Sequence, residues 1–320
     1  MRHKMNTKLK KILYLPNPRG FCAGVDRAIN IVELSLKKYG PPIYVRHEIV
    51  HNPWVIKDLE EKGVIFIEEL EEAPEGAHII FSAHGIPSEV LEDAKKRKMP
   101  YIDATCPLVI KVHNEAKKLY DQGAHIFLIG HKGHPEVIGT MGQIPKKFIT
   151  LIQKKEDIKR INSTDYGKVA LITQTTLSVD DTKDIINELK KVFPKIIEPP
   201  KEDICYATTN RQLAIKSIAS KCDVIYVIGA ENSSNSLRLV EVGKKSGCKN
   251  TSLISSISQV DWEEIKENDN IGLTASASAP DILVEEFITK LKTTYEVKIK
   301  NISVANENIT FKIPKILNER

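Results

Sequence analysis

Short apolar runs alternate along the chain with longer segments in which apolar residues recur at helical spacing. Residues Ile12–Leu15 have the length of a buried strand, and a stripe with the period of a helix follows over residues 24–39. This stripe consists of Val25, Ala28, Ile29, Val32 and Leu36. It stops at Gly40-Pro41-Pro42, where a helix cannot continue. Strands that alternate with helices predict parallel sheets covered by helices, and therefore an α/β fold.

Further elements follow the same alternation. Ile43–Val45 is a predicted strand, and Asn52-Pro53 has the cap and first-turn proline of a helix start. Ser178-Val179-Asp180-Asp181 begins another helix in the manner of a capping box. His125–Gly130 and Asp223–Gly229 are as long as buried strands. Because no run approaches the roughly 18 apolar residues that cross a bilayer, the sequence predicts a cytoplasmic protein without a membrane span.

A longer period lies beneath this alternation. Cys22, Cys106 and Cys205 each stand between a strand-like run and a helix-like run, and are separated by 84 and 99 residues. A second polar loop follows each cysteine after 29, 28 and 29 residues; these loops contain His51, His134 and Ser234. A third loop, more loosely spaced, contains His84, Thr175 and Ser278. The carboxyl ends of parallel strands are where such sheets bind ligands, so the nine loops predict one ligand site.

We interpret the period as three similar α/β units around a pseudo-threefold axis, although spacings alone can also agree by chance. The expected units are residues 11–105 with Cys22, 106–204 with Cys106, and 205–290 with Cys205. The tail, residues 291–320, alternates like strands at Glu296–Lys300 and Ile309–Ile313 and is expected to pack on the first unit.

The net charge of +5 is concentrated at the start of the chain. Five positive residues precede position 12: Arg2, Lys4, Lys8, Lys10 and Lys11. We interpret them as a solvated tail, because the remaining sequence is close to neutral. This distribution argues against a nucleic-acid-binding face in the folded part, and no nucleic-acid partner is predicted. A binder of nucleic acid remains an alternative that removal of residues 1–11 would test.

The cysteines favour metal chemistry over disulfides. They number five, no export signal is recognisable, and no Cys-x-x-Cys pair is present. Three converging thiolates without a fourth protein ligand can hold a 4Fe–4S cluster with one open iron, as a catalytic site requires. Zinc, three ordinary buried cysteines, and a non-catalytic sensor or electron carrier remain alternatives. Cys222 and Cys248 fall outside the pattern and are expected to be structural.

The loops predicted to line this site offer short hydrogen-bond donors. They are His51, His84, His134, Ser233, Ser234, Asn235 and Ser278. Imidazoles and hydroxyls at helix starts suit a phosphate or diphosphate, and no glycine-rich nucleotide motif is present. Glu136 is the carboxylate of these loops, and its position near anions favours a proton donor. A first-turn glutamate that interacts with the helix dipole is the alternative.

The same segments resemble the 4-hydroxy-3-methylbut-2-enyl diphosphate reductase family of the non-mevalonate isoprenoid pathway. The likeness runs from about residue 11 to 290, through segments 17–25, 44–52, 81–85, 103–109, 133–137, 173–180, 203–211 and 232–236. One departure is Ser276, which stands where the family more often has glycine.

The resemblance implies a trefoil of three α/β units around a central 4Fe–4S cluster held by Cys22, Cys106 and Cys205. It implies that the His, Ser and Asn residues above contact the substrate, mainly its diphosphate. It also implies that Thr175 joins the hydrogen-bond network of the substrate hydroxyl and that Glu136 delivers protons. The implied reaction is a two-electron reductive dehydroxylation to isopentenyl or dimethylallyl diphosphate. Flavodoxin or ferredoxin would supply the electrons.

Overall fold

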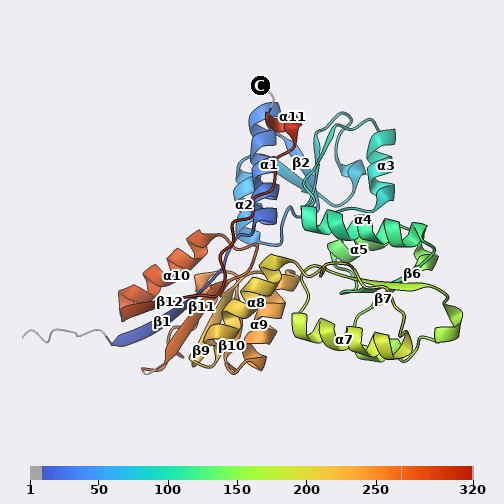
Figure 1. Ribbon diagram of the computed structural model, residues 1–320. Coiled ribbons are helices and arrows are strands. Elements are labelled where there is room, and N and C mark those ends of the chain that lie inside the picture. The colour runs from blue at the N-terminus through green and yellow to red at the C-terminus, as the bar shows by residue number, and fades with distance from the viewer. Residues whose placement is uncertain (1–8, 268, 319–320) are drawn as a thin grey trace, which may run out of the picture. The chain divides into compact units, whose positions relative to one another are not determined.

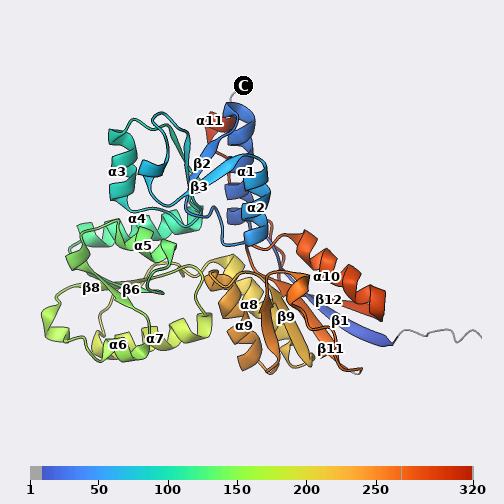
Figure 2. The ribbon, with the colours of Figure 1, turned by 180° about the vertical axis from the view of Figure 1, so that it is seen from behind.

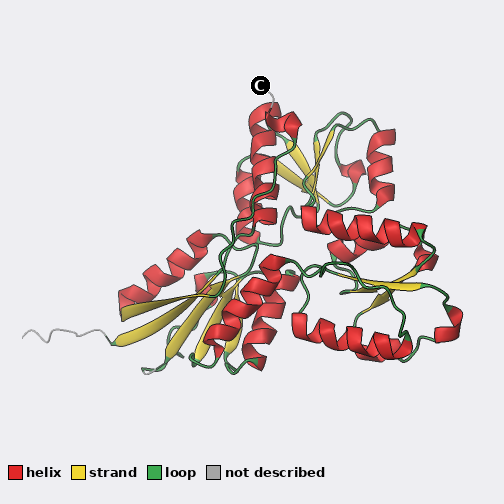
Figure 3. Ribbon diagram, in the orientation of Figure 1, coloured by secondary structure: helices red, strands yellow, loops and turns green. Residues whose placement is uncertain are grey.

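The structure, a computed structural model, describes residues 9–267 and 269–318 (Figure 1). Its strands form three sheets in which every paired strand is parallel, with helices packed against each sheet (Figure 3). The predicted α/β class with three parallel sheets is confirmed. Within these described residues, no helix is both long and apolar enough to cross a membrane.

The first sheet has the strand order β10-β9-β11-β1-β12. Its strands are β1 (Lys10–Asn17), β9 (Val224–Ile228), β10 (Thr251–Ile254), β11 (Asn270–Ala275) and β12 (Glu296–Ser303). Helices α8 (Tyr206–Ala219) and α9 (Ser234–Lys245) lie on one face, and α10 (Asp281–Thr294) lies on the other (Figures 1 and 2). Successive β9 side chains enter opposite cores: Ile225 and Val227 pack with α8 and α9, whereas Tyr226 and Ile228 pack with α10. The near-continuous apolar run in β9 follows from burial on both faces.

The second sheet has the order β3-β2-β4-β5. Its strands are β2 (Ile43–Arg46), β3 (Val64–Ile67), β4 (Ile79–Phe81) and β5 (Tyr101–Asp103), and its helices are α1 (Ala23–Tyr39), α2 (Pro53–Glu61) and α3 (Ser88–Lys96). Helix α1 packs on β2, and its buried stripe includes Ala28, Ile31 and Val32. The helical period read from residues 24–39 therefore corresponds to a helix with one buried face.

The third sheet has the order β7-β6-β8. Its strands are β6 (His125–Ile129), β7 (Ile149–Ile152) and β8 (Val169–Thr173), with α4 (Pro107–Asp121), α5 (Pro135–Met141), α6 (Lys155–Ile158) and α7 (Val179–Val192). Alternate β6 residues again enter two cores: Ile126 and Leu128 pack with α4, and Phe127 and Ile129 pack with α7. A parallel bridge between Ala170 and Ile197 extends this sheet beyond β8.

The three sheets repeat one strand order. In each sheet, one strand (β2, β6 or β9) lies between the two strands that follow it in the chain. The next strand in the chain (β3, β7 or β10) lies on one side of it, and the one after that (β4, β8 or β11) lies on the other side. A fourth segment pairs with the outer side of this last strand. That fourth segment is β5, the bridge at Ile197, or β1, and each leads into one cysteine. We call the chain from the helix after one cysteine to the next cysteine a repeat. The third repeat begins at α8 and is completed by β1 from the start of the chain.

The chain divides into two compact units. Unit 1 comprises the described residues up to Cys22, His51–Pro53 and Tyr206–Asn308, and unit 2 comprises Ala23–Val50, Trp54–Cys205 and the described residues from Ile309. Strand β1 falls within the expected range 11–105, but it is hydrogen-bonded to β11 and β12. The ranges assigned to the three units of the sequence pattern otherwise stay a prediction.

The C-terminal segment contains one of the two strands expected there. Strand β12 pairs with β1 along its whole length. The expected strand Ile309–Ile313 is wrong, because the backbone contact with β1 ends at Val304, whose N–H donates to the Asn17 carbonyl, and residues 305–314 are not part of a strand. The Glu307 carboxylate instead accepts from Asn210 and Arg211, and the Lys312 carbonyl accepts from Arg27. Helix α11 (Lys315–Asn318) follows and packs on α1.

The basic N-terminal run is not entirely a solvated tail. Lys11 is 1% exposed within β1, and its Nζ donates hydrogen bonds to the carbonyls of Lys266 and Glu267. A buried ammonium needs such acceptors, and here strand pairing brings them within reach. Arg2, Lys4 and Lys8 lie outside the described residues.

Candidate active site

Each of the three predicted cysteine ligands directly precedes a helix. Helices α1, α4 and α8 begin at Ala23, Pro107 and Tyr206, immediately after Cys22, Cys106 and Cys205. All three cysteines are partly exposed. Unpaired N–H groups and the positive end of the dipole make a helix start favourable for a thiolate.

The polar loops predicted from spacing are joined by one hydrogen-bond pattern in every repeat. The backbone N–H groups of Cys22, Cys106 and Cys205 donate to the carbonyls of Ala277, Ala83 and Thr175, at 3.2, 2.9 and 3.0 Å. These acceptors belong to the third loops. The third loops in turn donate to the chain just before each second-loop residue. The backbone N–H groups of Ala83, Gln174 and Ser276 bind the carbonyls of Ile49 and of the strand-end residues Ile129 and Ile228. The same backbone contacts therefore recur three times, but each cysteine contacts the third loop that the sequence pattern grouped with the preceding cysteine. Ser276 makes the same link as its counterparts.

Glu136 is the most strongly perturbed carboxyl group of these loops. It lies in the first turn of α5 and is 3% exposed. Its Oε1 accepts from the Thr175 N–H at 2.6 Å, and its Oε2 accepts from the Thr175 hydroxyl at 3.0 Å. Burial raises the pKa of Glu136 to about 7, against the opposing effect of the Thr175 hydrogen bonds. Glu136 and Thr175 are therefore in contact, and the carboxyl group can hold or release a proton near neutral pH.

A buried aspartate that the sequence reasoning overlooked contributes to this environment. The negative charge of Asp203 is a further cause of the raised pKa of Glu136. Asp203 accepts hydrogen bonds from the Thr173 N–H at 3.0 Å and from Lys111 Nζ at 3.1 Å. Burial raises the pKa of Asp203 as well. Its position two residues before Cys205 was the signal available in the sequence.

The histidines of unit 2 lie near one another. The rings of His84 and His134 are perpendicular, with centroids 5.9 Å apart. His134 caps α5, and its Nδ1 accepts from the Glu136 N–H at 3.1 Å. A neutral His134 ring therefore carries its proton on Nε2, the form that donates to an anion. Gly85 keeps the loop close to α4, because its φ is +82° and a Cβ there would lie 2.6 Å from the His113 ring.

The predicted residues of unit 1 form a second polar cluster. The Ser278 hydroxyl donates to the carbonyl of His51 at 2.9 Å. Asn235 accepts from the Ala277 N–H at 2.9 Å and donates to the Thr208 hydroxyl at 3.3 Å. Ser233 caps α9, where its hydroxyl accepts from the Ser236 N–H, and Ser234 is buried at the helix start. The side chains of Ser278, Asn235 and Ser233 thus hold these loops in place.

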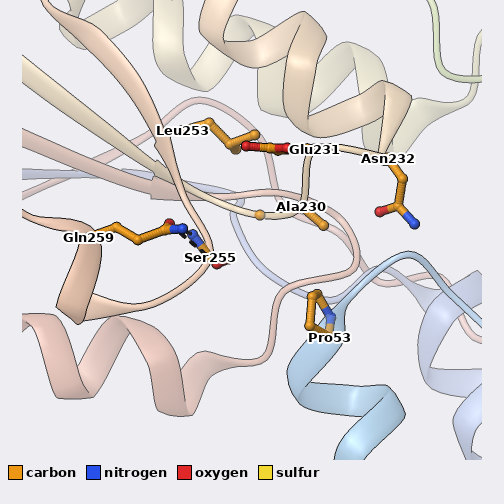
Figure 4. A pocket seen from close by; sticks show the side chains of 8 residues that line it. Pro53, Ala230, Glu231, Asn232, Leu253, Ser255 and Gln259 are labelled. Atoms are coloured by element: carbon orange, nitrogen blue, oxygen red, sulfur yellow. Dashed lines mark hydrogen bonds between the residues drawn. The ribbon is translucent and has the colours of Figure 1, made fainter.

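A cavity of about 730 Å³ lies beside this cluster in unit 1. The segment Gly229–Asn232 forms one wall, and Leu253, Ser255, Gln259 and Pro53 form the others (Figure 4). Gln259 is held by hydrogen bonds from the Ser255 N–H and hydroxyl at 2.7 and 3.2 Å. Its lining includes none of the side chains predicted to bind substrate, so the cavity adjoins the second loop without reproducing the predicted site.

The two remaining cysteines differ from the ligand candidates. Cys222 and Cys248 are 8% and 2% exposed and pack in the core between β9 and helices α8 and α9. Burial raises the pKa of Cys222 to about 12, so this thiol stays protonated. Their placement agrees with the expected structural role.

The whole chain is similar to solved structures of one enzyme. The structure of E-1-hydroxy-2-methyl-but-2-enyl-4-diphosphate reductase from Plasmodium falciparum shares 41% identity, with a TM-score of 0.91 over 98% of this chain and 97% of that one. Residues 13–292 match the family described as LytB protein. The chain belongs to the LytB family. This membership confirms the resemblance found over residues 11–290 and places the chain among oxidoreductases.

Other family members show the same likeness. A 4-hydroxy-3-methylbut-2-enyl diphosphate reductase from Ruegeria sp. (strain TM1040) is 52% identical over 313 residues, which cover 98% of this chain and 99% of the relative. The enzyme of that name from Hyphomonas neptunium is 53% identical over the same length. A solved structure of (E)-4-hydroxy-3-methyl-but-2-enyl diphosphate reductase has a TM-score of 0.64 at 32% identity and covers 89% of this chain and 99% of its own.

The raised pKa of Glu136 has a consequence for stability. An acid whose pKa is about 7 when folded, against an ordinary 4.5, binds more protons in the folded chain. Its contribution is therefore present at low pH and is lost as the pH rises through 7. We expect cluster-free Glu136→Gln, which cannot ionise, to be more stable than wild type at pH 8 by about 2 to 3 kcal/mol.

This advantage should vanish as the pH falls to about 5, where the wild-type carboxyl group is protonated too. Thermal unfolding followed by circular dichroism at both pH values measures the difference. Glu89→Gln is the matched control, because Glu89 is exposed in the first turn of α3. Equal stability of Glu136→Gln and wild type at pH 8 would show that ionisation of Glu136 does not destabilise the folded protein.

Proposed function

We propose that this chain reduces 4-hydroxy-3-methylbut-2-enyl diphosphate to isopentenyl and dimethylallyl diphosphate in the cytoplasm. Relatives of at least 50% identity that span nearly the whole chain are named 4-hydroxy-3-methylbut-2-enyl diphosphate reductase, which supports the substrate and the reductive reaction. The observation in the structure that supports it best is Glu136, a buried carboxyl group bound through both oxygens by Thr175, with a pKa of about 7. A group of that pKa is suited to donate a proton at neutral pH.

The cysteines suit a 4Fe–4S cluster held by Cys22, Cys106 and Cys205. Each thiol is partly exposed at the start of a helix, and each backbone N–H is held by the third loop of its repeat. Among residues 9–267 and 269–318, no three His, Cys, Asp or Glu side chains are grouped to hold a single metal ion. In a cluster each thiolate bonds a different iron, so the ligands need not crowd around one ion. Such a cluster would supply electrons one at a time and a Lewis-acidic iron for the substrate hydroxyl.

The reaction consumes two electrons and two protons. The allylic C–O bond breaks, the oxygen leaves as water, and one new C–H bond forms. We assign a proton delivery to Glu136, whose carboxyl oxygens are bonded to Thr175. Thr175 would thereby orient the acid and also contact the substrate hydroxyl. The two electrons would come from flavodoxin or ferredoxin.

The diphosphate requires donors of hydrogen bonds. We assign His51, His84, His134, Ser233, Ser234, Asn235 and Ser278 to this role. In unit 2, His134 supports the assignment because its Nδ1 is an acceptor and its Nε2 can carry the proton. In unit 1, Ser234 is the first residue of α9, and Ser278 lies three residues before α10. The N–H groups at a helix start are available to an anion.

Anaerobic reconstitution tests the proposal directly. The full-length chain should take up about four irons, as a 4Fe–4S centre requires. It should then convert the hydroxylated diphosphate with dithionite and a mediator dye. Absorption and paramagnetic-resonance spectra of the anaerobically purified protein distinguish a cluster from zinc. A colourless zinc protein, or a four-iron protein that leaves the substrate unchanged, would overturn the assignment.

A further inference from the structure

A cation follows each predicted ligand cysteine at almost the same distance. Arg27, Lys111 and Arg211 stand five, five and six residues after Cys22, Cys106 and Cys205. Each lies in the helix that the preceding cysteine begins, α1, α4 or α8. None of them was singled out by the sequence pattern. Their side chains do not turn back to that cysteine but reach the segment before the next one.

Arg27 contacts the segment that leads into Cys106. Its guanidinium donates to the carbonyls of Ala104 and Thr105 at 3.3 and 3.1 Å. Thr105 directly precedes Cys106, whose own N–H donates to Ala83 at 2.9 Å. Both ends of the peptide group before Cys106 are therefore hydrogen-bonded. This peptide group sets the direction in which the Cys106 side chain leaves the backbone.

Arg211 makes the same contact in the third repeat. It is fully buried and donates to the carbonyl of Gly20 at 2.8 Å and to that of Phe21 at 3.1 Å. Phe21 directly precedes Cys22, whose N–H donates to Ala277. The peptide group before this cysteine is held at both ends as well. Glu307 neutralises the guanidinium, with an N–O distance of 3.1 Å.

Lys111 makes a related contact in the second repeat, somewhat further from the cysteine. Its ammonium donates to the carbonyls of Lys201 and Glu202, both at 2.9 Å, and to the Asp203 carboxylate at 3.1 Å. Asp203 in turn binds the Thr173 N–H, and Cys205 donates to Thr175. The flexible lysine thus holds the loop before Cys205 through a carboxylate as well as through carbonyls.

These contacts follow from the repeat. The helix after one cysteine packs on the sheet of its own repeat, and the fourth segment of that repeat (β5, the bridge at Ile197, or β1) leads to the next cysteine. A long cation one turn into that helix can therefore reach the end of the repeat. A cation bound by several carbonyls restrains backbone that lacks the hydrogen bonds of a sheet or helix.

We propose that Arg27, Lys111 and Arg211 are positioning residues, each of which fixes the cysteine that ends its own repeat: Cys106, Cys205 and Cys22, respectively. The consequence for catalysis rests on the proposed function, since it requires these cysteines to be the cluster ligands. The positioning itself does not. It can be measured in the full-length chain without iron.

The test compares alkylation rates of individual cysteines. Cluster-free wild type, Arg27→Gln and Lys111→Gln are treated with iodoacetamide, and each cysteine-containing peptide is quantified over time by mass spectrometry. Arg27→Gln should accelerate alkylation of Cys106, and Lys111→Gln that of Cys205, each by roughly threefold to tenfold, because a lost hydrogen bond changes an equilibrium by about that factor. The alkylation rate of Cys22 should change less than twofold in Arg27→Gln, although Arg27 lies in the helix that begins directly after Cys22.

Matched controls separate positioning from loss of the fold. Lys37→Gln and Lys117→Gln remove exposed lysines from the same two helices. Neither substitution should change the alkylation rate of any cysteine. Buried Cys222 and Cys248 report global unfolding and should stay slow. Arg211→Lys, which keeps the buried charge, should accelerate Cys22 alone. Acceleration of Cys22 rather than Cys106 in Arg27→Gln, or equal acceleration of all five cysteines, would overturn the proposal.

The outcome is independent of the proposed reaction. If the cysteines respond as expected but wild type binds no cluster, the positioning stands and the proposed function fails. If wild type binds its cluster and turns over substrate while the cysteines do not respond, only the positioning is wrong.

Discussion

Glu136→Gln lowers the turnover of the reconstituted enzyme by roughly 10²- to 10⁴-fold, the range in which removal of a general acid falls. The glutamine keeps the shape of the side chain and a carbonyl oxygen that can accept from Thr175. It has no carboxyl proton to donate, whereas the wild-type carboxyl group, with a pKa of about 7, is partly protonated at neutral pH. Turnover with dithionite and a mediator, measured at saturating substrate, gives the ratio. Because the loss concerns proton delivery, KM should change much less than kcat.

The alternative role of Glu136 is that of a first-turn glutamate that stabilises a helix. Glu89→Gln controls for it, since Glu89 occupies the first turn of α3 and is exposed. Iron content and absorption spectrum should be unchanged in both variants. If Glu136→Gln retains the wild-type rate with a full complement of iron, Glu136 is not the proton donor.

Glu307→Ala destabilises the chain by about 3 to 5 kcal/mol, because removing one partner of a buried ion pair leaves an uncompensated charge. Arg211 is fully buried and is paired with Glu307, whose side chain is 15% exposed. Glu307 also accepts a hydrogen bond from Asn210 at 3.0 Å. Urea unfolding of the cluster-free protein measures the change, and Glu307→Gln, which still accepts hydrogen bonds, should lose less.

An exposed ion pair provides the comparison. Lys155 and Asp184 are 2.9 Å apart, and their side chains are 46% and 60% exposed. Asp184→Ala should cost less than about 1 kcal/mol, since solvent screens such pairs. A Glu307→Ala variant no less stable than Asp184→Ala would mean that Arg211 does not depend on its carboxylate partner.

Much of the fold could be predicted because local patterns determined it. The helical stripe over residues 24–39 became α1, and the run His125–Gly130 became β6. Ser178 caps α7 by accepting from the Asp181 N–H, as its spacing indicated. Such features depend on neighbours within a turn of helix or along one strand, so the sequence contains them directly. The pattern failed at Ile309–Ile313, where a strand also needed a partner strand that was absent from the surrounding segments.

The candidate site divides in the same way. The spacing of Cys22, Cys106 and Cys205 revealed that each cysteine has a third polar loop as a partner. It assigned the partners one step out of register, because every cysteine binds the third loop that the spacing grouped with the preceding cysteine. Spacing could not reveal that β1 completes the third repeat, because pairing of β1 with β11 joins residues about 260 positions apart. Nor could it reveal Asp203, whose importance arises from burial near Glu136.

The sequence by itself determined the α/β alternation, the three cysteines at helix starts and the polar loops between them. Only the tertiary structure decided which carbonyl groups the side chains of Arg27, Lys111 and Arg211 bind. It also decided that Glu136 is hydrogen-bonded to Thr175. The physical reason is range. Helices, caps and strands follow from contacts between residues near in sequence, whereas hydrogen bonds across 39 to 191 residues, and the pKa of a buried carboxyl group, exist only once the sheets have brought distant segments together.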